Sequence, residues 1–145
     1  MIVSPRPGEI ASPGERGSVG SRIFTPAEAT RTLPLVRRIV QDILTVGREL
    51  RVLWEREELT QAEEARAAEI AERLEDYFRE LDQIGCSFRS PDFSMGLVDF
   101  PAIIEGALVL LCWRDDEVDL RWYHEPHVGY TGRKPIPVEL LVAQP

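Results

Sequence analysis

The stretch IAERLEDYFRELDQIGCSFR, residues 70–89, contains the point at which one hydrophobic periodicity gives way to another. Before Gly85, apolar side chains recur every three or four residues, as they do on one face of a helix. After Gly85, apolar and polar side chains alternate, as they do on a strand with one buried face. Glycine readily adopts the left-handed conformation in which helices often end. The sequence therefore predicts an α+β fold, with helices before Gly85 and a small antiparallel sheet after it.

Two helices are predicted before Gly85, over residues 26–54 and about residues 60–84. Each is preceded by a threonine with a glutamate three residues later, in T-P-A-E from Thr25 and T-Q-A-E from Thr60. In such a capping box the two side chains satisfy free backbone amides at the start of a helix. The heptad spacing of the first helix does not continue beyond its end, and the apolar stripe of the second helix runs in a different register. We therefore predict a long antiparallel helical hairpin rather than one continuous helix.

A meander of short strands is predicted after Gly85, over residues 86–89, 96–104, 107–113 and 117–124. If both tight turns of the meander contain two residues, one apolar face runs along the strands and ends at His124. We expect the helical hairpin to pack on that apolar face. The same register places Asp99, Cys112 and Asp119 together on the opposite face of the sheet.

The composition argues against several classes of protein. The chain has 145 residues and a formal net charge of −8, from 17 Lys and Arg against 25 Asp and Glu. Such an acidic chain lacks the stripe of cations that nucleic-acid binding requires, and no apolar run approaches the roughly 18 residues of a membrane helix. Cys86 and Cys112 lack the spacing of a zinc or redox motif, which favours two reduced thiols in a cytoplasmic protein. We predict no nucleic-acid partner and no membrane partner.

Four short motifs in the second half of the chain carry a family resemblance. They are GLVDFP at residues 96–101, LCW at 111–113, WYH at 122–124 and GYTGRKPI at 129–136. In this order, and behind an F-T-x-x-E-A start and an L-P-L helix, they resemble the DUF2203 family of small bacterial proteins of unknown function. The resemblance covers about residues 24–136. It implies a domain boundary and a cytoplasmic location, and it supplies no reaction.

Three segments are expected along the chain. Residues 1–23 are predicted to be a disordered tail, because they mix Pro, Gly and Ser with charge. Residues 24–137 form a single α+β domain similar to DUF2203, and residues 138–145 form a C-terminal tail.

One end of the predicted sheet carries the candidate binding residues. The run G-Y-T-G-R-K from Gly129 is typical of a loop in which backbone amides and an arginine fork bind an anion. Because the proline and glycine between His124 and Arg133 favour a chain reversal, we predict a pocket formed by His124, Tyr130 and Arg133, with a paired carboxylate nearby. These three residues are the candidates for binding a small anionic ligand.

Metal binding and catalysis receive less support from the sequence. The run H-E-P-H from His124 to His127 offers two imidazoles, but it lacks a third ligand at a definable spacing, so we predict no metal and no cofactor. Asp99 is interpreted as a structural carboxylate that pairs with Arg121 or Arg133, and the predicted pocket is not centred on it. No residue is assigned a catalytic role, and the sequence leaves open whether the protein is an enzyme.

Two functions are expected from this arrangement. The first is a cytoplasmic interaction or assembly module that forms a homodimer through the helical hairpin, because the sheet is too small to cover both helices. Ile39, Val46 and Leu53 lie at heptad spacing beside the main apolar stripe and are expected at the dimer surface. The alternative is a small ligand-binding protein or enzyme, with an anion or metal site at the end of the sheet between His124 and Arg133.

Overall fold

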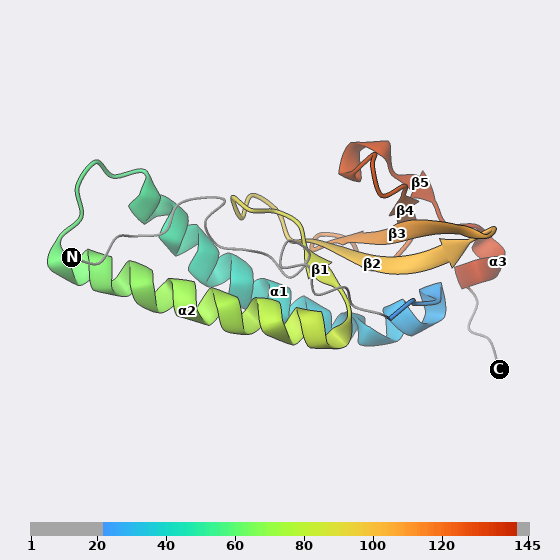
Figure 1. Cartoon of the computed structure of the whole chain (residues 1–145), viewed down its shortest axis with the longest axis horizontal. Coiled ribbons are helices and arrows are strands. Elements are labelled where there is room, and N and C mark those ends of the chain that lie inside the picture. The colour runs from blue at the N-terminus through green and yellow to red at the C-terminus, as the bar shows by residue number, and fades with distance from the viewer. Residues whose placement is uncertain (1–21, 142–145) are drawn as a thin grey trace.

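The computed structural model describes residues 22–141, so nearly all of the predicted N-terminal tail lies outside the described residues. The first two elements are long helices, α1 (Pro26–Trp54) and α2 (Gln61–Ile84). Figure 1 shows them side by side and joined by a loop at one end. The predicted helical hairpin is confirmed.

The ends of both helices follow from their local sequence. The hydroxyl of Thr25 accepts a hydrogen bond from the backbone N–H of Glu28, and the carboxylate of Glu28 accepts one from the backbone N–H of Thr25. Thr60 and Glu63 make the same reciprocal pair at the start of α2. The chain leaves α2 through Gly85, whose φ of 108° is unfavourable for any residue with a side chain. These local signals explain why the helix bounds agree with the prediction.

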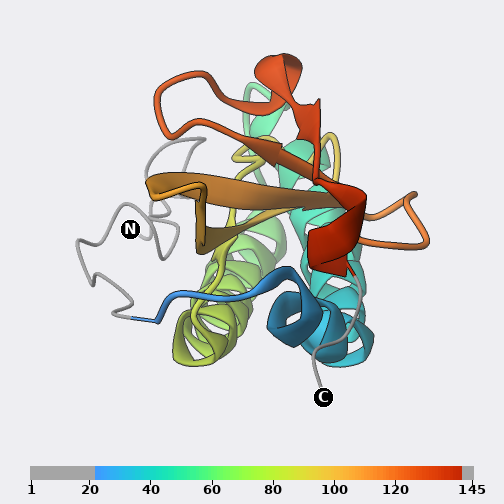
Figure 2. The ribbon, with the colours of Figure 1, turned by 90° about the vertical axis from the view of Figure 1, so that its right-hand side faces the viewer.

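A five-stranded antiparallel sheet follows the helices, and its strands lie side by side in chain order. In Figure 2 both helices lie on one side of this sheet. The strands are β1 (Ser87–Phe88), β2 (Leu97–Ile104), β3 (Ala107–Arg114), β4 (Trp122–His124) and β5 (Lys134–Pro135). Two short helices accompany them, the 3₁₀ helix η2 (Tyr130–Gly132) and α3 (Val138–Leu141). The predicted α+β architecture is thus confirmed.

One hydrophobic core joins the helical hairpin to the inner face of the sheet. Alternate residues of the two central strands supply the sheet side of this core, and each is at most 3% exposed: Val98, Phe100 and Ala102 in β2, and Val109, Leu111 and Trp113 in β3. Because side chains alternate across a strand, the residues between them belong to the outer face. That outer face includes Asp99 and Cys112, which lie directly opposite each other.

The residues expected at a dimer surface are buried inside the chain, so this part of the prediction is wrong. Ile39, Val46 and Leu53 are 4%, 6% and 7% exposed, and all three belong to the core. The hairpin is covered by more than the sheet, because the segment between β1 and β2 places the buried ring of Phe93 against α1 at Gly47. Self-association stays a prediction, but these three side chains are not available for it.

The last predicted strand, residues 117–124, is wrong in length. Only Trp122–His124 form β4, and residues 115–121 form a loop. The indole N–H of Trp113 donates a hydrogen bond of 3.0 Å to the backbone carbonyl of Glu117, and the guanidinium of Arg37 donates to the same carbonyl at 3.3 Å. The side chains of Trp113 and Arg37 therefore bind a carbonyl that strand pairing would otherwise use.

The register of β4 also differs from the prediction. Trp122 faces Cys112, three positions along β3 from Val109, which a two-residue turn would have placed opposite it. Because strand side chains alternate with a period of two, an odd shift moves every side chain of β4 to the other face. His124 therefore lies on the outer face of the sheet, together with Asp99, and not at the end of the apolar face.

Three further elements were not predicted. β5 pairs with β4, η2 lies within the expected loop, and α3 lies within residues 138–145, which were predicted to form a tail. Within residues 22–141, no helix combines the length and the apolar character that crossing a bilayer would require.

The contact between α1 and Phe93 leads to a first testable prediction. A Cβ at Gly47 would overlap the ring of Phe93, which is itself stacked between Trp54 and Phe88 with centroid distances of 6.1 Å. Gly47→Ala should therefore lower the free energy of unfolding by about 1–3 kcal/mol, although alanine is the better helix former. Urea denaturation followed by circular dichroism measures the change.

The matched control is the same substitution in a Phe93→Ala background. There the overlap is absent, so alanine at position 47 should stabilise the protein through helix propensity. An equal loss of stability in both backgrounds would contradict the assigned contact.

Candidate functional site

Three chemically different side chains converge on the outer face of the sheet. Asp99 comes from β2, Cys112 from β3 and His124 from β4, so three adjacent strands position them. All three are buried, and one ligand atom from each lies within 4.8 Å of the others. Among residues 22–141, this is the one group of three or more His, Cys, Asp and Glu side chains with such an arrangement.

Both ring nitrogens of His124 face oxygen atoms. Nδ1 lies 2.8 Å from the backbone carbonyl oxygen of Glu125, and Nε2 lies 3.2 Å from each carboxylate oxygen of Asp99. A carbonyl oxygen only accepts hydrogen bonds, so Nδ1 carries a proton and donates it. A hydrogen bond between Nε2 and Asp99 needs one further proton between the two groups, and with that proton the two side chains are neutral as a pair.

The electrostatics of the three residues follow from their contacts and burial. The hydrogen bond to Asp99 raises the pKa of His124, although desolvation acts in the opposite direction. Burial raises the pKa of the Cys112 thiol, and the neighbouring Asp99 carboxylate adds to that rise, whereas Arg133 opposes it. Both Cys86 and Cys112 are free thiols.

The guanidinium of Arg89 lies beside this neutral pair. Its Nε lies 3.5 Å from Oδ2 of Asp99, and its side chain is 36% exposed. The predicted partners of Asp99 are wrong, because Arg121 binds Asp119 and Arg133 binds Glu117. Arg89 follows β1 directly, and β1 pairs with β2 opposite Asp99. A strand of two residues gives too short a pattern to predict this pairing.

A cavity of about 320 Å³, here called the Asp99–His124 cavity, opens over the pair. Its lining residues are Arg89, Leu97, Asp99, Leu110, His124, Pro126, Gly129 and Tyr130. The polar groups form its floor and part of its wall, and the leucines and the proline provide apolar contact area. It combines a buried polar pair with a partly exposed cation and an apolar wall.

The structure brings together two of the three predicted binding residues, because His124 and Tyr130 both line the Asp99–His124 cavity. Asp99 lines it as well and is a paired carboxylate in this cavity, although the predicted pocket was not centred on it. The reason is the register of β4, which places His124 on the same face of the sheet as Asp99.

Arg133, the third candidate, is engaged elsewhere. Its guanidinium binds Glu117 at 2.9 Å and lies 4.6 Å from the ring centroid of Tyr130 and 5.1 Å from that of Trp122. Only 13% of its side chain is exposed. Its charge is compensated by Glu117, and it supports the ring of Tyr130 from outside the cavity lining.

The two histidines of the H-E-P-H run do not converge on one site. His124 is 3% exposed, whereas the His127 side chain is 80% exposed and has the carboxylate of Glu125 3.6 Å away. Glu125 also accepts a hydrogen bond of 3.1 Å from Lys134. The described structure therefore gives no support to a metal site built from both imidazoles.

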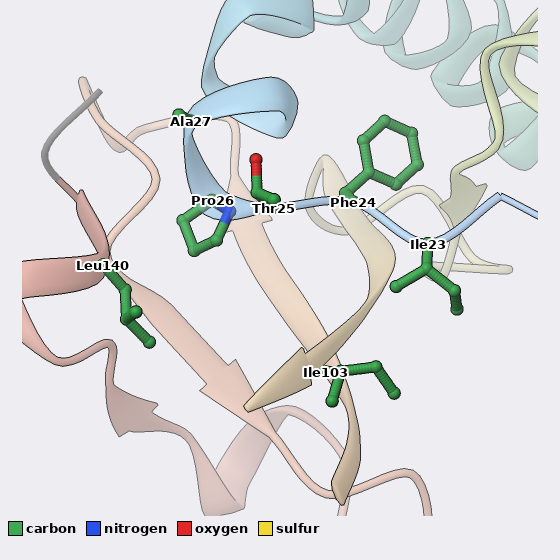
Figure 3. A pocket seen from close by; sticks show the side chains of 7 residues that line it. All are labelled: Ile23, Phe24, Thr25, Pro26, Ala27, Ile103 and Leu140. Carbon is green, nitrogen blue, oxygen red and sulfur yellow. The ribbon is translucent and has the colours of Figure 1, made fainter. Parts of the chain in front are cut away.

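A second cavity, of about 220 Å³, lies where the chain enters α1 (Figure 3). Ile103 and Leu140 line it from β2 and α3, opposite the segment from Ile23 to Ala27. No lining side chain is titratable, so this cavity offers apolar contact and little chemistry. The Asp99–His124 cavity is therefore the better candidate for a functional site.

The comparison with known families agrees with the motifs on these strands. A family model described as "Uncharacterized conserved protein (DUF2203)" matches residues 22–136. No curated protein and no solved structure matches the chain. Asp99, Cys112, His124 and the Tyr130 loop all lie within the matched range, which spans most of the sequence. The chain belongs to the DUF2203 family.

Proposed function

We propose that this protein binds a small anionic ligand in the Asp99–His124 cavity. The observation that carries the proposal is a buried polar pair at the floor of an open cavity whose other walls are largely apolar. Ligand pockets are usually concave and mostly apolar, with a few polar groups that orient the ligand. A cavity of about 320 Å³ lies within the range of such pockets.

The charges around the cavity favour an anion. Asp99 and His124 share one proton and are neutral as a pair, so the guanidinium of Arg89 adds a net positive charge to the wall. Asp99 is the one carboxylate among the lining residues. A ligand with a single carboxylate or phosphate-type group would neutralise Arg89, and the hydroxyl of Tyr130 offers a further polar contact.

The apolar wall indicates what accompanies the charged group. Leu97, Leu110 and Pro126 line the cavity beside the polar floor. Burying apolar ligand surface against them contributes about 25 cal/mol per Å². The proposed ligand is therefore a small organic monoanion with an apolar part rather than an inorganic anion alone.

The proposal includes a cytoplasmic location, which is supported by the two buried free thiols. It does not depend on self-association through the helical hairpin, which stays a separate prediction.

Replacing Arg89 tests the proposed function directly. Benzoate serves as a probe that combines one carboxylate with an apolar ring, and inorganic phosphate serves as an anion without an apolar part. Arg89→Met should weaken benzoate binding by about tenfold or more, because a hydrogen bond to a charged group contributes about 1.5–3 kcal/mol. Chemical-shift titration measures the affinity, with the amide signals of β4 as reporters.

Arg121→Met is the matched control. Arg121 directly precedes β4, is exposed, binds Asp119 and does not line the cavity. This variant should bind benzoate as the unmodified protein does. The proposal is wrong if benzoate and phosphate leave the signals around His124 and Tyr130 unchanged, or if both arginine variants weaken binding equally.

A further inference from the structure

The geometry points to a binding site for one transition-metal ion of the Zn²⁺ type, held by Asp99, Cys112 and His124, of which Asp99 and His124 line the Asp99–His124 cavity. The three residues are buried, and their ligand atoms lie within 4.8 Å of one another. The metal site itself stands on this cluster alone. The further statement that an anionic ligand completes the coordination rests on the proposed function.

The chemistry of the three ligands selects the kind of ion. A thiolate, an imidazole and a carboxylate are the ligands that zinc takes in proteins, whereas Ca²⁺ and Mg²⁺ prefer oxygen atoms alone. The three come from adjacent strands of one sheet, which is a more rigid support than a loop. The predicted register placed Asp99 and Cys112 on one face of the sheet, but His124 was expected on the other face, and the three residues lie in separate motifs without metal-binding spacing.

The distances fit a tetrahedral ion. With metal bonds of about 2.0–2.1 Å, neighbouring nitrogen and oxygen ligands of a tetrahedral zinc site lie about 3.4 Å apart. Nε2 of His124 lies 3.2 Å from each carboxylate oxygen of Asp99. That separation is at the long end of the range for an N–H···O hydrogen bond, and it is close to the edge of the tetrahedron. The ligand atom of Cys112, its Sγ, lies within 4.8 Å of the ligand atoms of the other two residues.

The orientation of His124 is that of a metal ligand. Metal-binding histidines almost always donate the second ring N–H to a carboxylate, a backbone carbonyl or water, which fixes the ring. Nδ1 of His124 makes this bond to the carbonyl of Glu125 at 2.8 Å. Nε2 consequently faces the carboxylate of Asp99, which leaves it available for coordination.

The charge balance also permits a divalent ion. Without metal, the cluster holds two exchangeable protons, one between Asp99 and His124 and one on the Cys112 thiol. A divalent ion would replace both protons and leave the total charge of the cluster unchanged. This matters because a buried cluster tolerates an uncompensated charge poorly. Proton release on binding is a general property of such sites.

Three protein ligands leave the fourth position of the ion open. Zinc sites that carry out chemistry have three protein ligands, whereas structural sites are closed by four. Asp99 and His124 line the cavity together with Arg89, so the open position can be reached from it. If the proposed function holds, the anionic group of the ligand occupies this fourth position and pairs with Arg89 at the same time.

The experiment measures metal uptake by the full chain after dialysis against EDTA. Native mass spectrometry gives the stoichiometry, and competition with a chromophoric chelator gives the zinc affinity. We expect one Zn²⁺ per chain. Co²⁺ is a second probe, because its absorption spectrum reports tetrahedral geometry and a sulfur-to-cobalt charge-transfer band reports a thiolate ligand.

Cys112→Ser is the test variant, and Cys86→Ser is its matched control. Both cysteines are buried, but only Cys112 belongs to the cluster. Zinc affinity should fall by about 100-fold or more in Cys112→Ser, since even the loss of an outer hydrogen-bond partner commonly costs 10–100-fold. Cys86→Ser should keep the affinity and the cobalt charge-transfer band. If Cys112→Ser does not fold, the cobalt spectrum of the unmodified protein decides whether a thiolate binds.

The inference is wrong if the unmodified protein takes up no stoichiometric zinc or cobalt, or if both serine variants bind zinc equally well. Its failure is distinguishable from failure of the proposed function. Benzoate binding that depends on Arg89 in EDTA-treated protein would support the anion site alone. Zinc uptake that persists in Arg89→Met, without any benzoate binding, would support the metal site alone.

Discussion

Replacing Trp113 with alanine should lower the free energy of unfolding by about 3–5 kcal/mol, the usual cost of removing a buried large aromatic side chain. Trp113 is fully buried in the core between the sheet and the helices. Its indole N–H donates to the carbonyl of Glu117 at 3.0 Å, and the guanidinium of Arg37 lies 5.3 Å from its ring centroid. The substitution therefore removes packing, a hydrogen bond and a cation–π contact together.

A loss of this size is a large part of the 5–15 kcal/mol by which a typical domain is stable. Urea denaturation followed by far-ultraviolet circular dichroism measures it. Trp122→Ala is the matched control, because Trp122 lies on the outer face of the sheet and is only partly buried. Trp113→Phe should fall between the two, since it keeps a ring but loses the N–H donor. A loss in Trp113→Ala no greater than in Trp122→Ala would contradict the assigned role.

Removing the contact between Asp99 and His124 should cause the second large loss in the free energy of unfolding. In metal-free protein, Asp99→Ala and His124→Ala should each cost about 3–5 kcal/mol, because each leaves a buried polar group without its main partner. Asp99 and His124 side chains are 5% and 3% exposed. The double variant should cost less than the sum of the single variants, by about 0.5–3 kcal/mol. The four proteins are compared by urea denaturation in the presence of EDTA.

The matched control is the same cycle on Asp119 and Arg121, an ion pair at 3.0 Å whose side chains are more than half exposed. Exposed ion pairs contribute little to the free energy of unfolding, so those substitutions should change it by small and additive amounts. Additive losses at Asp99 and His124 would show that the two side chains do not stabilise each other.

The helices could be predicted because contiguous residues specify them. The capping boxes at Thr25 and Thr60 and the glycine after Ile84 lie next to the helix ends that they determine. The β2–β3 turn is equally local, because Glu105 and Gly106 adopt positive φ values of 52° and 80° and connect the strands with two residues. The opposition of Asp99 and Cys112 follows from that turn, so the sequence predicted it as well.

The binding site was only partly predictable from the sequence. His124 and Tyr130 were named as binding candidates, and both line the cavity, but Arg89 was not recognised. Arg89 reaches Asp99 because β1 pairs with β2, and the strand predicted over residues 86–89 was too short to set the register of that pairing. The planar guanidinium of Arg133 could bind an anion, but it already binds the carboxylate of Glu117. No sequence signal connects those two residues.

Local sequence signals specify the helical hairpin, the β2–β3 turn and the side-chain types available to a site. Long-range contacts set which face of the sheet His124 occupies. Trp113 and Arg37 both bind the carbonyl of Glu117, and the loop that they hold displaces β4 by three positions along β3. Side chains alternate with a period of two along a strand, so this odd shift carries His124 from the apolar face to the face of Asp99 and Cys112. Arg37 lies in α1, so the decisive contact joins residues that are 80 positions apart.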